Sequence, residues 1–172
     1  MSEKYTTPAN TRIGHVHLKV ANLDKSLKFY CDLLGFELIM KSGNEAAFIS
    51  AGGYHHHIGL NTWYSKDTKP GSIYAPGLFH VAIVYPERKD LAVIYKRLLD
   101  RKYPLTGVAD HGVSEALYLS DPDENGIELY WDRPENEWPR NSKAQIEMYT
   151  RPLNVQKLLQ ELKEPGPDQS FQ

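Results

Sequence analysis

The sequence predicts an α+β fold in which two tandem βαβββ modules form a curved, half-open mixed sheet, a cupped barrel with its helices outside, followed by a helix in the C-terminal tail. Three observations predict this fold: an internal repeat, a strand-like alternation that opens each copy, and a helical apolar stripe that follows each alternation. The chain has 172 residues, of which 41% are hydrophobic, and this is enough for a sizeable core.

The repeat appears when the chain is compared with itself. One shift brings His15 onto His80 together with the apolar residues around them, and a slightly larger shift brings residues 45–50 onto residues 115–120. The two shifts occur in the same order along the chain and differ by a short insertion, as expected of two related copies. We therefore place the modules at about 13–64 and 78–132, within one domain over residues 11–133, and an extension over residues 134–172.

Each module is predicted to open with a strand and to continue with a helix. In the first module, Val16, Leu18 and Val20 alternate with polar residues at the period of two that places them on one face. The helix that follows has Asp24 as its expected N-cap and Gly35 at its end. Its apolar stripe consists of Leu27, Tyr30, Leu33 and Leu34. The second module repeats the pattern with strand residues Phe79, Val81 and Ile83 and a stripe of Leu91, Ile94, Tyr95, Leu98 and Leu99.

Shorter strands are expected after each helix. The turn at 121–126, Asp-Pro-Asp-Glu-Asn-Gly, is typical of a hairpin, and the Pro- and Gly-containing segment 64–77 is expected to link the modules. In the extension, an apolar stripe predicts a short helix at about 154–163. The expected strands are residues 36–40, 45–50 and 56–61 in the first module and residues 116–119 and 126–131 in the second.

Charge and composition exclude several classes of function. The formal net charge is -2 and no basic stripe is interleaved with aromatic residues, so a nucleic-acid partner is not expected. No apolar run approaches the roughly 18 residues that a membrane span needs. The single cysteine, Cys31, cannot form an internal disulfide, and the N-terminus lacks a secretory signal, so we expect a cytoplasmic protein.

Seven histidines stand out, and strand alternation places several of them on the face turned away from the helices. His15 and His80 occupy equivalent positions at the start of the two modules. In the last strand Ile127 and Leu129 are expected to face the helix, which leaves Glu128 on the side of the histidines. His15, His80 and Glu128 thus form a set of two histidines and one carboxylate, which suits Fe(II) or Mn(II).

The other histidines are divided between this polar face and structural positions. His57 is expected on the polar face, where counting from Ser50 and Ser120 places it opposite Glu128 in the repeat. A lone histidine on a strand is more often structural than a ligand. Structural positions are therefore expected for His17, His55 and His56.

Four segments resemble the vicinal oxygen chelate superfamily, which contains glyoxalases, antibiotic-resistance proteins and extradiol ring-cleavage dioxygenases. They are residues 14–20 (GHVHLKV), 26–36 (SLKFYCDLLGF), 77–83 (GLFHVAI) and 118–129 (YLSDPDENGIEL). Within the superfamily, the chain is similar to single-domain, catechol-2,3-dioxygenase-like members, because Tyr118 stands ten residues before Glu128 and the segment 147–153 looks like that subgroup.

The resemblance implies a metal-dependent extradiol dioxygenase that cleaves the ring of a catechol-like aromatic diol with O2. It implies Fe(II) as the cofactor, with Mn(II), Ni(II) or Zn(II) as alternatives, held by His15, His80 and Glu128. His57 would act as the base toward the diol, while Tyr118 and His111 would donate hydrogen bonds to the reacting oxygens. Modules of this superfamily often pair across subunits, so a homodimer is also expected.

Two other functions on the same fold stay open. If His57 is a fourth metal ligand, the site suits a glyoxalase-type isomerase, lyase or transferase that acts on a chelating small molecule without O2. Such sites more often use two carboxylates, one in each module. The third possibility is a non-catalytic drug-binding resistance protein, although such binders usually lack the full ligand set.

Overall fold

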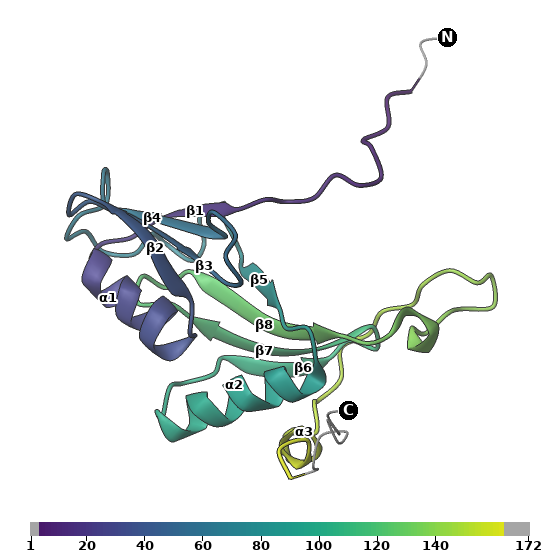
Figure 1. Ribbon diagram of the computed structural model, residues 1–172. Helices are drawn as coiled ribbons and strands as arrows, with labels where there is room; N and C mark the ends of the chain where they lie inside the picture. Colours follow the sequence, from purple (N-terminus) through teal and green to yellow (C-terminus); the bar gives the residue numbers. More distant parts are fainter. Residues whose placement is uncertain (1–3, 164–172) are drawn as a thin grey trace, which may run out of the picture. The chain divides into compact units, whose positions relative to one another are not determined.

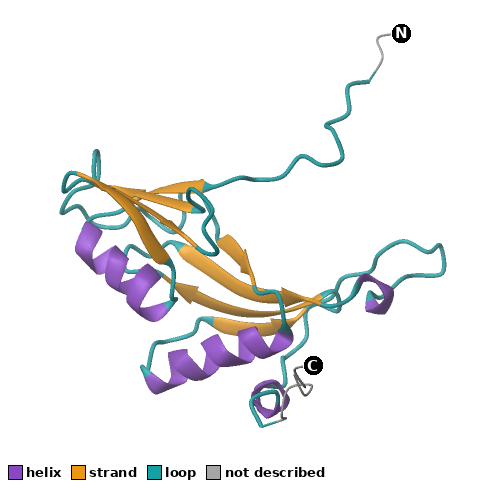
Figure 2. Cartoon of the chain, viewed as in Figure 1, coloured by secondary structure: helices purple, strands orange, loops and turns teal. Residues whose placement is uncertain are grey.

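The computed structural model describes residues 4–163 and contains two four-stranded mixed sheets with few helices (Figures 1 and 2). The chain divides into two compact units, Met1–Lys69 and Pro70–Gln172, called the first and second unit below. Each unit contains one βαβββ module, and a further helix follows in the tail. The predicted α+β class is therefore confirmed.

The first unit contains one sheet with the strand order β1-β4-β3-β2. Strands β1 and β4 are parallel, and the other neighbours are antiparallel. Its core consists of buried apolar side chains from β1, β3, β4 and the helical segment. The elements are β1 (Val16–Lys19), α1 (Leu23–Leu27), the π-helix η1 (Lys28–Leu33), β2 (Glu37–Ser42), β3 (Ala46–Ser50) and β4 (Ile58–Asn61).

The second unit repeats this topology with the strand order β5-β8-β7-β6. Again the first strand and the last strand of the module are parallel, which requires the crossover that the helix provides. Helix α2 packs on β8 and against the tail helix α3. The elements are β5 (Val81–Val84), α2 (Arg88–Asp100), β6 (Gly107–Asp110), β7 (Ser114–Ser120), β8 (Gly126–Asp132), the 3-10 helix η2 (Glu135–Glu137) and α3 (Val155–Gln160).

The first helix begins earlier than its expected N-cap, Asp24. Asn22 is the actual N-cap, because its extended backbone lets the side-chain oxygen accept a hydrogen bond from the Lys25 N–H at 3.0 Å. Asp24 lies in the first turn, where a carboxylate also interacts well with the helix dipole. Gly35 follows the helical segment with a positive φ of 89°, as the predicted helix end requires.

The second module differs from its expected pattern in three places. Phe79 precedes β5 instead of lying in its apolar face, and it is 89% exposed. Leu99 is exposed although it lies in the expected stripe of α2, whose other members are buried. Strand β6 carries only Val108 and Ala109 as apolar side chains, a pattern too short to identify a strand from the sequence.

The C-terminal extension is mostly loop, with η2 and the short helix α3 as its regular elements (Figure 2). Helix α3 is shorter than the predicted range of 154–163, and Asn154 caps its start. Leu158 on α3 is fully buried. Residues 164–172 of the expected extension lie outside the described residues. Among residues 4–163, no helix combines the length and the apolar character that crossing a membrane would require.

Candidate functional site

His80 and Glu128 lie side by side in the second unit. His80 directly precedes β5, and Glu128 lies on β8 opposite Ala82. Alternation along β8 buries Ile127 and Leu129 and turns Glu128 to the other face, as the sequence predicts. The Nε2 atom of His80 lies 3.0 Å from Oε2 of Glu128, and the two side chains are 32% and 13% exposed.

Tyr118 joins this pair from the neighbouring strand. It is directly opposite Glu128 in the antiparallel register of β7 and β8. Its hydroxyl donates to Oε1 of Glu128 at 3.0 Å. Burial, followed by the adjacent Glu128 carboxylate, raises the pKa of Tyr118, so the hydroxyl keeps its proton at neutral pH.

His111 extends the cluster beyond Tyr118. It follows β6 directly, and its Nε2 atom lies 2.7 Å from the Tyr118 hydroxyl. Its Nδ1 atom faces the tail, at 3.0 Å from the carbonyl oxygen of Tyr149 and at 3.3 Å from Oγ1 of Thr150. Glu128, Tyr118 and His111 therefore form a continuous hydrogen-bond chain from the His80 pair to the C-terminal extension.

His80, Tyr118 and His111 border a cavity of about 390 Å³, which is within the range of small-molecule sites. Apolar groups and a few polar groups line it, as in many small-molecule sites. Its lining includes Phe79, His80, Thr106, His111, Tyr118 and Thr150. Thr150 and the Tyr149 carbonyl are functional candidates that sequence reasoning did not assign, although the likeness of segment 147–153 to the dioxygenase subgroup was a signal.

His15 and His57 lie in the first unit, on neighbouring strand ends. The N–H of Val16 donates to the His57 carbonyl at 3.0 Å, which places the two histidines next to each other. Nδ1 of His57 lies 2.9 Å from Oγ of Ser50 and 3.3 Å from the Ala51 amide nitrogen. The His15 ring packs against the His56 ring, with 4.4 Å between centroids.

The strand register corrects the expected equivalence of His57 and Glu128. Ile58 pairs with Val16 in the first module, and Ile127 pairs with Val81 in the second, so the residue equivalent to Glu128 is Gly59. The prediction was wrong because the connection from β3 to β4 is one residue longer than the connection from β7 to β8, whereas the counting made it one residue shorter. A side chain at position 59 would lie 2.9 Å from the His17 ring, which occupies that space.

His55 and His56 pack together, with 4.6 Å between ring centroids, whereas the His17 ring packs against Phe48 and Trp63. Burial and the neighbouring His15 lower the pKa values of His17 and His56. Nδ1 of His55 lies 2.8 Å from Nδ1 of His56. Within either unit, the described residues contain no group of three His, Cys, Asp or Glu side chains that could hold a metal ion.

His80 and Glu128 have the donor atoms and the spacing that two ligands of one divalent ion would need. Ligand atoms at about 2.1 Å from an ion and at a right angle are about 3.0 Å apart, the observed Nε2–Oε2 distance. Nδ1 of His80 is buried and has no hydrogen-bond partner among the described residues. The surrounding protein groups therefore leave the hydrogen-bonding capacity of this ring nitrogen unsatisfied.

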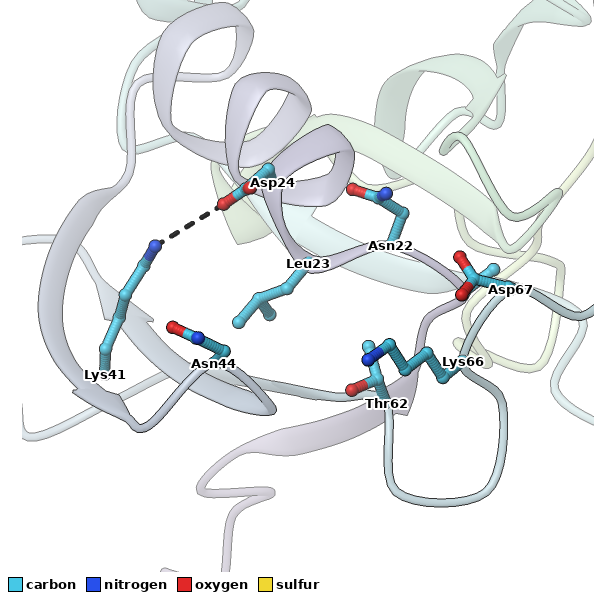
Figure 3. Close-up of a pocket in the computed structure, with 9 residues that line it drawn as sticks. Asn22, Leu23, Asp24, Lys41, Asn44, Thr62, Lys66 and Asp67 are labelled. Atoms are coloured by element: carbon cyan, nitrogen blue, oxygen red, sulfur yellow. Dashed lines mark hydrogen bonds and ion pairs between the residues drawn. The ribbon is translucent and has the colours of Figure 1, made fainter.

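A second cavity of about 330 Å³ lies in the first unit, at the start of α1 (Figure 3). Its charges balance, since Lys41 pairs with Asp24 at 3.5 Å and Lys66 and Asp67 also line it. None of the predicted site residues borders this cavity.

Comparison with known proteins identifies relatives of two enzyme classes. The chain matches the family described as "Glyoxalase/Bleomycin resistance protein/Dioxygenase superfamily" over residues 12–129. It is 38% identical to "Catechol-2,3-dioxygenase" of Bacillus subtilis over 157 residues, which cover 88% of this chain and 52% of that protein. It is 27% identical to "Probable lactoylglutathione lyase" of Synechocystis over 123 residues, which cover 67% of this chain and 91% of that protein. The chain thus spans about half the length of the Bacillus relative.

Solved structures support the fold. A glyoxalase/dioxygenase from Nostoc punctiforme aligns with a TM-score of 0.63 at 16% identity and covers 78% of this chain and 100% of that one. A lactoylglutathione lyase from Agrobacterium tumefaciens aligns with a TM-score of 0.57 at 18% identity and covers 72% of this chain and 96% of that one. At these identities the likeness concerns the fold alone.

Proposed function

The chain belongs to the glyoxalase/bleomycin resistance protein/dioxygenase superfamily, and we propose that within it the protein is an extradiol dioxygenase that cleaves the ring of a catechol-like diol with O2. The observation that carries this proposal is the chain of contacts from His80 through Glu128 and Tyr118 to His111 beside an apolar cavity. The Bacillus subtilis relative, with 38% identity, supports the same activity.

We propose His15, His80 and Glu128 as the ligands of one divalent metal ion, with Fe(II) as the natural ion and Mn(II), Ni(II) or Zn(II) as alternatives. Two imidazoles and a carboxylate are donors that suit Fe(II), and the pair in the second unit already has a ligand-like separation. When bound, the ion supplies Lewis acidity and open positions at which the diol and O2 are oriented.

We propose His57 as the base that accepts a proton from the diol. Its Nδ1 atom lies 2.9 Å from Oγ of Ser50 and accepts a hydrogen bond from the Ala51 N–H at 3.3 Å, so these two contacts orient the ring. An imidazole held in a fixed orientation suits proton transfer near neutral pH. Tyr118 keeps its proton and can therefore donate a hydrogen bond to an oxygen that gains negative charge, and His111 orients this hydroxyl.

A glyoxalase-type isomerase or lyase is the second candidate, because lactoylglutathione lyases are among the relatives. In this alternative, His57 is a fourth ligand. Gly59 counts against it, since the position equivalent to Glu128 carries no side chain and cannot supply a second carboxylate.

The test is an oxygen-electrode assay after anaerobic loading with Fe(II). A panel of catechols is expected to cause O2 uptake in a one-to-one ratio to the ring-cleaved product. The His57→Gln variant should keep its iron and lose most of this activity. Isomerisation of the glutathione–methylglyoxal adduct with Ni(II) or Zn(II), without O2 uptake on any catechol, would replace the proposal with the glyoxalase-type function.

A further inference from the structure

The cavity beside His80 and Tyr118 is larger than a single diol ring needs. It measures about 390 Å³, whereas a cavity of about 150 Å³ holds one benzene molecule. We infer that the remaining space, on the β6 side of Tyr118, receives an uncharged apolar substituent of the substrate, and that Gly107 is the specificity-determining residue that keeps this space open. This assignment rests on the proposed function for the diol itself and adds which diols the site prefers.

The strand register shows where the space lies. Gly107 on β6 pairs with Tyr118 on β7, and Tyr118 pairs with Glu128 on β8, so the three positions form one row across the sheet. Neighbouring strands are about 4.8 Å apart, which places position 107 about 10 Å from Glu128, with Tyr118 between them. Gly107 and Ala109 both line the cavity. The cavity therefore extends from the proposed metal ligands, past Tyr118, to β6.

The side chains on β6 are small where they face the cavity. Gly107 and Ala109 lie two residues apart and share a face of the strand, whereas Val108 lies on the other face. A Cβ at position 107 would lie 3.8 Å from Cδ2 of Tyr118, an ordinary contact, so a side chain there would stand beside the tyrosine ring. Gly107 does not have a positive φ, so its backbone does not require glycine. What the glycine provides is space.

The lining of the cavity determines which kind of substituent fits. Among the described residues, those that line it include no Lys, Arg, Asp or Glu. Its two imidazoles, His80 and His111, already contact Glu128 and Tyr118. A carboxylate on the substituent would lose its hydration without gaining a cationic partner, which is unfavourable. An alkyl or aryl group gains hydrophobic free energy when it leaves water, and it needs no partner.

Gly107→Leu is the test variant, because the leucine side chain would occupy the space beside Tyr118. The matched control is Gly71→Leu. Gly71 lies in the loop between β4 and β5, does not have a positive φ, and would have no heavy atom within 4 Å of an added Cβ. Gly107→Val carries a smaller side chain on the same strand, and it serves if circular dichroism shows that Gly107→Leu does not fold.

The experiment compares kcat/KM for catechol, for 3- and 4-ethylcatechol, and for the two dihydroxyphenylacetates that carry a carboxymethyl group in place of the ethyl group. In the wild type and in Gly71→Leu, we expect the better ethylcatechol to exceed catechol by about 10-fold, as burial of two further carbon atoms implies. The matching carboxymethyl diol should be at least about 10-fold poorer than the ethyl diol. In Gly107→Leu, the ratio of ethylcatechol to catechol should fall to about one or below.

Binding is measured separately, by calorimetric titration of the same diols into the Zn(II)-loaded full chain without O2. The affinities should follow the same order as the kcat/KM values, and Gly107→Leu should remove the preference for the ethyl group. This measurement does not depend on turnover, so it separates the substituent space from the proposed reaction.

A wild type that prefers catechol or the carboxymethyl diols to the ethylcatechols would overturn the inference. So would an ethyl preference that a folded Gly107→Leu protein keeps. In both cases cleavage of catechol with O2 would leave the dioxygenase proposal standing. If no diol is cleaved but the ethylcatechols bind best, and Gly107→Leu abolishes this preference, the dioxygenase proposal fails and the role of Gly107 stands. If no diol is cleaved or bound, both fail.

Discussion

Glu128 contacts both His80 and Tyr118, so one carboxylate joins the proposed metal ligands to the hydrogen-bond chain. Glu128→Gln keeps the size of the side chain but removes its charge. We expect metal affinity to fall by more than the roughly 10–100-fold loss that is typical of outer-shell partners, and activity to fall with it. Metal content after dialysis measures the effect, with Glu137→Gln as the control because Glu137 is exposed on η2. Equal metal content in both variants would exclude Glu128 as a ligand.

Gly126 determines where His80 lies. A Cβ at position 126 would overlap the Phe79 carbonyl oxygen and would lie 3.1 Å from the His80 Cβ. Gly126→Ala is therefore expected to displace His80 from Glu128 and to weaken metal binding by about 10-fold or more. Isothermal titration with Mn(II) measures this, and Gly107→Ala is the control, since its Cβ makes only an ordinary contact of 3.8 Å. Unchanged affinity in Gly126→Ala would contradict this positioning role.

At the scale of the elements, a partly buried ion-pair network fixes the tail helix to the second module. Both oxygens of Glu115 are paired, with Arg88 at 2.8 Å and with Arg133 at 2.8 Å. Arg88 also binds Glu161, which directly follows α3. The network therefore connects α2, β7, the end of β8 and α3.

Removing the central carboxylate should destabilise the second unit strongly. Glu115→Gln leaves two partly buried guanidinium groups without their shared anion, and we expect a loss of about 3 kcal/mol in the free energy of unfolding. Glu161→Gln should cost less, because that carboxylate is 33% exposed and lies at the edge of the network. Urea denaturation of the two variants measures the difference. A smaller loss for Glu115→Gln than for Glu161→Gln would be inconsistent with this description.

The sequence predicts helices and strands well where a long hydrophobic pattern specifies them. It predicts less well the features that depend on a few long-range contacts. The repeat and the alternation along β8 place His80 and Glu128 on one polar face, as observed. The short strand β6 has too little apolar pattern to be recognised. The equivalence of Gly59 and Glu128 depends on a single turn residue, which simple counting assigns to the wrong module. The contact of Tyr149 with His111 is long-range and carries no local pattern.

At the scale of the whole molecule, alkaline stability depends on the half-buried Tyr85. Burial, followed by the nearby Asp90, raises the pKa of Tyr85 from 10.0 to about 12. A raised pKa in the folded state gives a contribution that is complete below the unfolded pKa and is lost as pH rises from 10 toward 12. We expect Tyr85→Phe to reduce the loss of stability between pH 9 and pH 11 by about 1 kcal/mol. Thermal unfolding across this range measures it, and parallel curves for both proteins would contradict the expectation.

The proposed ligands come from both units of the chain, since His15 belongs to the first and His80 and Glu128 belong to the second. If these three residues bind one ion, metal binding should depend on residues of both modules. Dependence on His15 would distinguish a metal ion that all three residues bind from a His80–Glu128 ion pair, which would not involve the first unit.

The most direct test is an anaerobic Fe(II) titration of the wild type and of His15→Ala, His80→Ala and Glu128→Ala. We expect one Fe(II) per chain in the wild type and a loss of tight binding in each of the three variants, with His17→Ala retaining it. Undiminished Fe(II) binding in His15→Ala, or no Fe(II) binding in the wild type, would contradict the account.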